Sequence, residues 1–114
     1  ISQGYQTNRL FSEIKNKKIK NSINLVDIFR SKPFPRKIIN DIKKAKNLII
    51  IDEQILSSSL TSIIGEVLIQ ENINIKVKSF HLSENHVFDN GGREKLLNNN
   101  GLSISQINNY LNNL

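Results

Sequence analysis

Short apolar runs recur along the chain and predict β-strands. Residues 48–52 read Leu-Ile-Ile-Ile-Asp and are apolar on both faces, which is typical of a central strand in a parallel sheet covered by helices on both sides. Residues 75–80 alternate apolar and polar side chains, which predicts a strand with one solvent-facing side, nearer the sheet edge. Residues 23–29 are rich in branched side chains, and residues 1–3 resemble the end of a strand. The pattern therefore predicts four strands.

Apolar residues also recur at the spacing of helices. Three helices are predicted from sets of inward-facing side chains: Leu10, Phe11 and Ile14 after Gly4; Ile38, Ile39 and Ile42; and Leu60, Ile63, Ile64, Val67 and Leu68. Burial of the third set would contribute roughly 8–15 kcal/mol before conformational entropy is subtracted, so we expect that helix to belong mainly to the core. A helical stretch follows at residues 93–97. In the last helix Ser103 and Gln106 predict a capping box, with Leu102 packed against Ile107.

Strands that alternate with helices through short connections predict an α/β fold. We expect three layers, α/β/α, with a mostly parallel sheet in the order 2-1-3-4 and right-handed crossovers. In such sheets ligands and partners meet the carboxyl ends of strands at the switch point, here between the first and third strands. The residues expected to meet at that point are Gly4, Tyr5, Gln6, Asp52, Glu53 and Gln54.

Length and composition limit the possibilities. With 114 residues, 38% of them apolar, we expect one domain over residues 1–114. The absence of cysteine excludes disulfides, thiolate metal sites and cysteine nucleophiles. No segment resembles a signal peptide or a membrane span, so we expect a cytoplasmic protein without a membrane partner. Because the chain begins at Ile1 with what resembles a strand end, we also expect it to be a fragment of a longer protein.

The net charge of +6 is unevenly distributed. Residues 1–46 carry twelve Lys or Arg against three acidic residues, whereas the remainder carries four against seven. A basic half is compatible with nucleic-acid binding. However, the lysines gather at helix ends and turns, where they favour the helix dipole, and no aromatic residues alternate with them as stacking platforms. We therefore expect no nucleic-acid partner.

The segment 52–68, DEQILSSSLTSIIGEVL, is the first candidate for chemistry. Ser57, Ser58 and Ser59 precede a helix, and serine in that position is most simply a cap for free backbone amides. A serine nucleophile would need a positioned base and a glycine-flanked elbow, which this segment lacks. The free amides at the helix start suit an anion, but Asp52 and Glu53 oppose one. We expect no catalytic serine.

Two further groups of residues are weaker candidates. His81, Glu84 and His86 fall in one loop but lack the spacing that places two histidines on one metal, so we expect no metal site. Residues 89–92, Asp-Asn-Gly-Gly, are not followed by Lys-Ser or Lys-Thr and predict a turn rather than a nucleotide loop. Asp52 occupies the position of a receiver-domain phosphoacceptor, but the acids that a receiver carries after its first strand are absent.

The order of these segments resembles the C-terminal domain of transketolases. The resemblance rests on a strand, Gly4 and a helix, then VDIFRSKPFP, LIIIDEQ, LTSIIGEVL, VFDNGGREKLL and GLSISQI, and it covers essentially the whole chain. Deoxyxylulose-phosphate synthases and the beta subunits of 2-oxoacid dehydrogenases share this domain. Asp52 and Glu53 match the acidic pair of the family. The following His and glycines are replaced, the substituting residues being Gln54, Ser58, Ser59 and Thr61.

The resemblance implies an accessory role. In the family, two preceding domains bind thiamine diphosphate with its divalent metal, Mg²⁺, and transfer two-carbon ketol units between sugar phosphates in carbohydrate metabolism. The C-terminal domain packs against them and supports a homodimer. It also implies an antiparallel strand preceding Ile1. For this chain it implies no catalytic, cofactor-binding or metal residue. The surface expected to face a neighbouring domain or subunit comprises Gly4, Tyr5, Gln6, Asp52, Glu53, Gln54, Ser57, Ser58 and Ser59.

Two readings from other classes stay open. A free-standing binding or signalling module of flavodoxin-like topology would need a complete first strand within its own reading frame. A basic nucleic-acid-binding domain would show affinity that falls steeply with salt, because counterions are released from phosphates.

Overall fold

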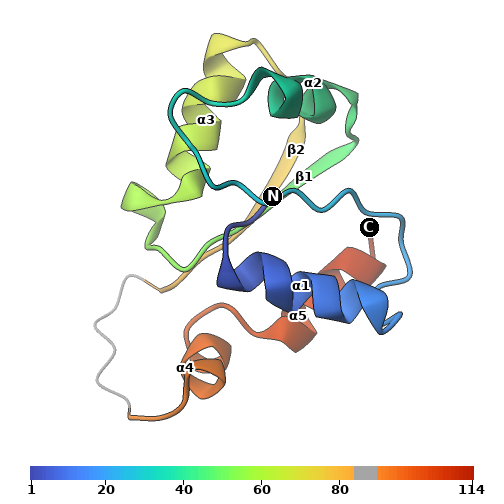
Figure 1. The fold of residues 1–114 in the computed structure, drawn as a ribbon, viewed down its shortest axis with the longest axis vertical. Helices are drawn as coiled ribbons and strands as arrows, with labels where there is room; N and C mark the ends of the chain where they lie inside the picture. The colour runs from blue at the N-terminus through green and yellow to red at the C-terminus, as the bar shows by residue number, and fades with distance from the viewer. Residues whose placement is uncertain (84–89) are drawn as a thin grey trace.

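The structure is a computed structural model that describes residues 1–83 and 90–114, apart from the side chain of Ser58. This part of the chain forms an α/β domain with five α-helices, a short 3-10 helix and two strands (Figure 1). In chain order these are α1 (Tyr5–Lys15), α2 (Arg36–Lys44), β1 (Asn47–Ile51), η1 (Leu56–Ser58), α3 (Leu60–Gln70), β2 (Lys76–Phe80), α4 (Arg93–Asn99) and α5 (Ile104–Asn112).

The two strands form a parallel sheet. Their register runs from Asn47 opposite Lys76 to Ile51 opposite Phe80, and α3 makes the crossover between them. The predicted strands at residues 48–52 and 75–80 are therefore confirmed to within one residue. β1 has the buried character expected of a central strand, because Leu48, Ile50 and Ile51 are all nearly inaccessible.

The strands predicted at residues 1–3 and 23–29 are not present as strands. Ser2 makes one isolated parallel bridge to Asp27 and another to Ile51. The physical reason is the length of the partner. Among the described residues the backbone of residues 23–28 pairs only with Ser2, and so short a partner cannot support a continuous ladder of hydrogen bonds. The structure thus has two strands in its described residues, and the four-strand sheet stays a prediction.

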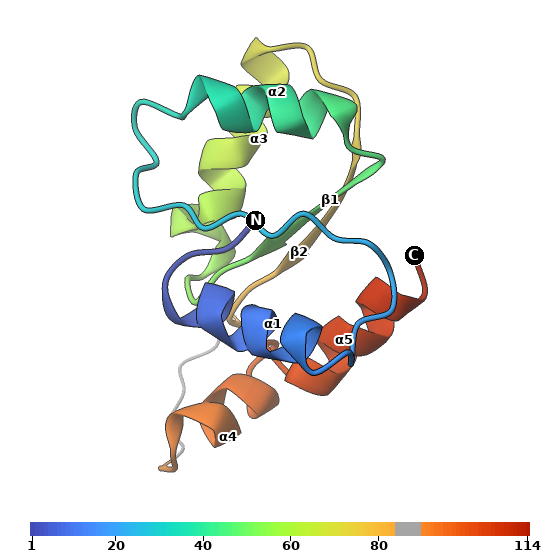
Figure 2. The same ribbon diagram turned by 45° about the vertical axis from the view of Figure 1, so that its right-hand side comes forward.

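Apolar clusters lie on both sides of β1. Leu48 and Ile50 pack with residues of α2 and α3, whereas Ile51 packs with residues of α1, α4 and α5. Figures 1 and 2 show the same division, with α2 and α3 on one side of the strands and α1 and α5 on the other. The strand periodicity of two produces this division, because successive side chains of β1 point to opposite faces.

Two details of the predicted helices were wrong. Phe11 does not share the inner face of α1, since 59% of it is exposed while Leu10 is buried. Consecutive helical residues lie about 100° apart, so a face centred on Leu10 includes Ile14 and leaves Phe11 outside. In α5, Ser103 is the N-cap but its hydroxyl pairs with that of Ser105, 2.9 Å away, so the predicted capping box does not form. Leu102 and Ile107 do pack in one cluster, as predicted.

The longest helices in the described part of the chain, α1 and α3, have 11 residues each. A membrane-spanning helix needs roughly 20 apolar residues. Among the described residues there is no helix with the length and apolar character to cross a bilayer.

Candidate functional site

The end of β1 and the start of the chain meet as the switch-point prediction requires. Ile1 accepts a hydrogen bond from the amide of Ile51 at 3.0 Å, which brings the next residues of both segments together. The side-chain amide of Gln3 donates to Asp52 Oδ1 at 3.1 Å, and that of Gln6 donates to Glu53 Oε1 at 2.8 Å. The structure thus places the Gly4–Gln6 turn beside the acidic pair.

Gly4 makes the turn between Ser2 and α1. Its φ angle of +55° lies in the left-handed region that side chains with a Cβ adopt at a cost. Its amide donates to Asp27 Oδ1 at 2.9 Å, and the Thr7 hydroxyl donates to the same oxygen at 2.7 Å. Asp27 therefore holds the turn, a role that sequence reasoning missed. The available signal was its position as an acid within a predicted strand that neighbours the first one.

Asp52 is a buried structural carboxylate. Only 1% of it is exposed, and its Oδ2 accepts the backbone amide of Leu60, the first residue of α3, at 2.7 Å. Its other oxygen accepts from Gln3, as described above. Ser59 caps the next amide of the same helix, with Thr61 N donating to its hydroxyl at 3.1 Å. Asp52 and Ser59 thus satisfy successive amides at the start of α3. The expectation that a serine here is a cap is confirmed for Ser59.

Glu53 is held by α4 as well as by α1. Arg93 Nη2 lies 2.8 Å and 2.7 Å from its two carboxylate oxygens. The same guanidinium stacks on the ring of Tyr5, with Cζ 3.8 Å from the ring centroid. The hydrogen bond with Glu53 raises the pKa of Arg93 above its ordinary value. Arg93, which lies 40 residues from Glu53 in the chain, was not predicted as part of this site.

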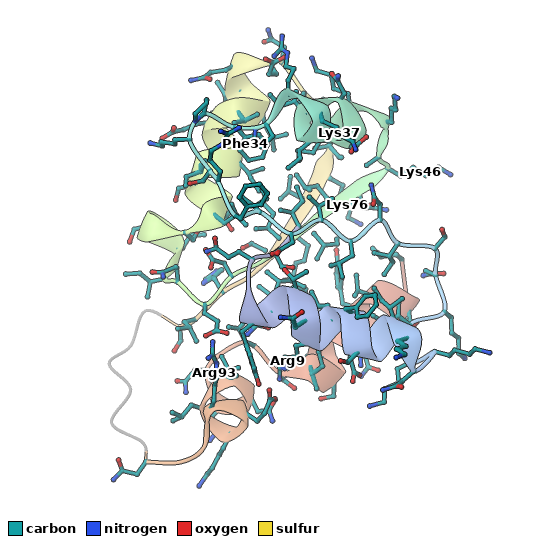
Figure 3. All side chains as sticks on the ribbon, viewed as in Figure 1. Arg9, Phe34, Lys37, Lys46, Lys76 and Arg93 are labelled. Atoms are coloured by element: carbon teal, nitrogen blue, oxygen red, sulfur yellow. The ribbon has the colours of Figure 1, made fainter. Side chains whose placement is uncertain are left out.

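Glu94 completes a link between α1 and α4. Its carboxylate accepts the Tyr5 hydroxyl at 2.6 Å and Arg9 Nη2 at 2.7 Å. Figure 3 labels Arg9 and Arg93, which lie on the α1–α4 side of the molecule. The bond from Tyr5 lowers the pKa of Glu94, with Arg9 acting in the same direction, and it raises the pKa of Tyr5. We call Tyr5, Arg9, Glu53, Arg93 and Glu94 the α1–α4 network.

The titration of Tyr5 tests this network. In a Tyr110→Phe background Tyr5 is the only tyrosine, and we expect its phenol to ionise at a pH above the ordinary value of 10. Because the folded-state pKa is the higher one, the contact stabilises the fold below pH 10 and is lost as the pH rises through the folded-state pKa. Adding Glu94→Gln should return the pKa towards 10, as measured by phenolate absorbance. An unchanged pKa in the double variant would exclude the Tyr5–Glu94 bond.

The loop after the acidic pair exposes apolar rather than catalytic groups. Gln54 and Ser57 are exposed, Ile55 and Leu56 are 42% and 40% exposed, and the Ser58 side chain lies outside the described residues. Ser59 is buried, and besides its capping bond its hydroxyl donates to the Leu56 carbonyl at 2.9 Å. Among the described residues no serine is hydrogen-bonded to a histidine, the pairing that a serine nucleophile requires.

The possible metal and nucleotide segments are only partly described. Glu84, His86 and Asp89 fall outside the described residues, so the predictions about the 81–86 loop and the 89–92 turn stay predictions. His81 Nδ1 lies 2.9 Å from the Leu82 carbonyl. In the ranges 1–83 and 90–114, no three His, Asp or Glu residues gather in a way that suits a metal ion. The carboxylates of Asp52, Glu53 and Glu94 each accept hydrogen bonds from other residues of the chain.

Comparison with known proteins adds no family. A scan against protein-family models, a search of curated proteins and a search of solved structures each found no match.

Proposed function

We propose that this chain is a C-terminal accessory domain of a transketolase-like enzyme and is not catalytic in isolation. In the intact protein, thiamine diphosphate and Mg²⁺ would bind to the preceding domains, where two-carbon ketol units would be transferred between sugar phosphates. This domain would pack against those domains and support a homodimer. The proposal rests on the order of the sequence motifs and on the state of the groups at the carboxyl ends of the strands.

The observation that carries the proposal is that the acidic groups of this surface are already satisfied. Asp52 serves α3, while Glu53 and Glu94 serve the α1–α4 network. A catalytic carboxylate must instead be within reach of a substrate, as general acid–base chemistry requires. Carboxylates that are already paired within the chain, next to exposed apolar side chains, suit a protein–protein interface, because the core of such an interface is depleted in charged residues.

The exposed apolar residues give this surface its contact groups. Tyr5 is 38% exposed, and Ile55 and Leu56 are exposed to a similar degree just after the acidic pair. Phe29, two residues after the bridge at Asp27, is 95% exposed. Gln6, Asp52 and Ser59, by contrast, are buried and would support this surface from within. We propose that a neighbouring domain or subunit covers the exposed residues.

The proposal also includes a sheet larger than the two observed strands. We propose the four-strand, three-layer arrangement in the order 2-1-3-4, with the segments around Asp27 and Ser2 completing the sheet beside β1. The parallel bridges of Ser2 to Asp27 and to Ile51 support this order, since they place Ser2 between the two segments. The apolar clusters on both sides of β1 support helices on both faces.

Titration calorimetry tests the accessory role. We expect the 114-residue chain to give no saturable heat with thiamine diphosphate and Mg²⁺, and to transfer no ketol unit between sugar phosphates. An intact transketolase under the same conditions is the positive control. Saturable binding of the cofactor by the chain alone would contradict the division of roles, and turnover would contradict it more strongly.

A further inference from the structure

An apolar cavity of about 620 Å³ lies beside Ile1, at the opposite end of β1 from the candidate site. Two backbone segments, residues 21–26 and 45–49, form its edges. Ile38 and Ile42 of α2 line it, as do Ile14 of α1 and Leu111 of α5. Its volume is within the range of specific binding sites, and its lining is mostly apolar.

The hydrogen bonds of Ile1 and Ser2 show how the chain segments that border this cavity are arranged. The Ser2 amide donates to the Val26 carbonyl at 3.0 Å, and the Ile28 amide donates to the Ser2 carbonyl at 2.8 Å. On the other side, the Ile51 amide donates to Ile1, and the Ile1 nitrogen donates to the Ile49 carbonyl at 2.6 Å. Ile1 and Ser2 therefore pair as the middle strand of three parallel segments.

The cavity continues the line of that middle segment. Neighbouring strands lie about 4.8 Å apart, so two segments that flank a third are separated by roughly twice that distance. A chain running parallel to β1 into Ile1 would pass between residues 23–25 and 47–49, which are the cavity's own edges. In Figures 1 and 2 the amino terminus indeed lies in the middle of the fold, between β1 and the segment that leads to α2.

The lining also sets the chemistry of an occupant. Side chains on one face would meet Ile38 and Ile42, and those on the other would meet Ile14 and Leu111. A strand in this place is covered on both faces, so each of its positions must be apolar, unlike an edge strand with alternating polarity. The exposed polar lining residues Asn21, Asn24 and Lys46 offer contacts only near solvent.

We propose that this cavity is a strand slot that takes an extended apolar segment of about three residues, joined through a peptide bond to Ile1 and running parallel to β1. A separate peptide is a poorer occupant, because it would leave the Ile1 ammonium buried and would lose its own translational and rotational freedom on binding. Burial already lowers the pKa of that ammonium to about 6, and a peptide bond at Ile1 removes the charge.

If the slot is filled, hydrogen exchange should slow at particular backbone amides. In a parallel ladder, the register of Ile1 and Ser2 continues so that a segment in the slot accepts hydrogen bonds from the amides of Ile49 and Val26. Those two amides should exchange with solvent more slowly when the slot is filled. The amide of Asp52, directly after β1, already donates to the Phe80 carbonyl of β2 and should change only with global stability.

The experiment compares three forms of the chain. One begins at Ile1, one carries Val-Ile-Val before Ile1, and the matched control carries Ser-Lys-Ser there. Both extensions remove the buried ammonium, so only the apolar one should fill the slot. We expect Val-Ile-Val to lower the unfolding equilibrium constant on the order of 10-fold relative to Ser-Lys-Ser in urea, after the entropy of ordering is subtracted. We also expect it to slow exchange at Ile49 and Val26.

Equal stability and equal exchange in the two extended forms would overturn the proposal. So would protection of Ile49 and Val26 by the free peptide acetyl-Val-Ile-Val-amide as strong as that given by the joined segment, since the proposal commits to a segment joined to Ile1. Slowed exchange at the two amides in the Val-Ile-Val form alone would support it. The outcome does not depend on the proposed accessory role in a transketolase-like enzyme, because such a slot can exist in a domain with any function.

Discussion

Replacing Asp52 by alanine is expected to lower the free energy of unfolding by about 2–3 kcal/mol. The buried carboxylate accepts the Leu60 amide and the Gln3 side chain, and its removal leaves a buried amide at the start of α3 without a partner. A buried donor left unsatisfied costs about 1–3 kcal/mol, and the loss of a helix cap costs about 1 kcal/mol. Urea unfolding followed by circular dichroism measures the change.

Two control variants separate the cap from the charge. Asp52→Asn keeps one acceptor oxygen and should lose only about 1 kcal/mol. Glu66→Ala makes the same change in net charge at an exposed position of α3 and should change stability by less than about 0.5 kcal/mol. If Asp52→Ala were no more destabilising than Glu66→Ala, the buried capping role of Asp52 would be wrong.

The second large effect is expected in the middle of α3. Ile64 is fully buried against β1, whereas 79% of Ile69 on the same helix is exposed. Ile64→Ala should lower the free energy of unfolding by about 2–5 kcal/mol through lost burial and a residual cavity. Ile69→Ala changes helix propensity equally and should shift stability by at most about 0.5 kcal/mol. The same urea titration measures both, and similar losses from the two variants would contradict the observed orientation of α3.

The elements that could be predicted from sequence are those with a strong local signal. Residues 48–52 are apolar at every position but the last, and this pattern located β1 and its burial. The proline pair before residue 36 and the spacing of Ile38, Ile39 and Ile42 located α2. In these cases hydrophobic periodicity and backbone restrictions act within one short window, so no knowledge of distant residues is needed.

What could not be predicted depends on distant partners. Residues 23–29 have the composition of a strand, but strand formation needs a paired neighbour, and among the described residues only Ser2 provides one. Arg93 and Glu94 joined the site through contacts with residues 40 and 89 positions away, which no local pattern specifies. The capping box failed for a smaller reason, because the Ser103 hydroxyl found a nearer partner in Ser105.

The juxtaposition of Gln6 and Glu53 was predictable because parallel topology alone fixes which strand ends meet. The role of that surface was less predictable, because it depends on whether each carboxylate is free or paired. Asp52 could be read as a phosphoacceptor or an interface residue from sequence, and its burial and its bond to Leu60 identify it as a helix cap.

The most direct test of the accessory-domain proposal is to read the coding sequence immediately upstream of the codon for Ile1. We expect several hundred in-frame codons that include the Gly-Asp-Gly cofactor motif and the catalytic glutamate of transketolase-like enzymes. A start codon directly before Ile1, or an upstream region without that motif, would contradict the proposal.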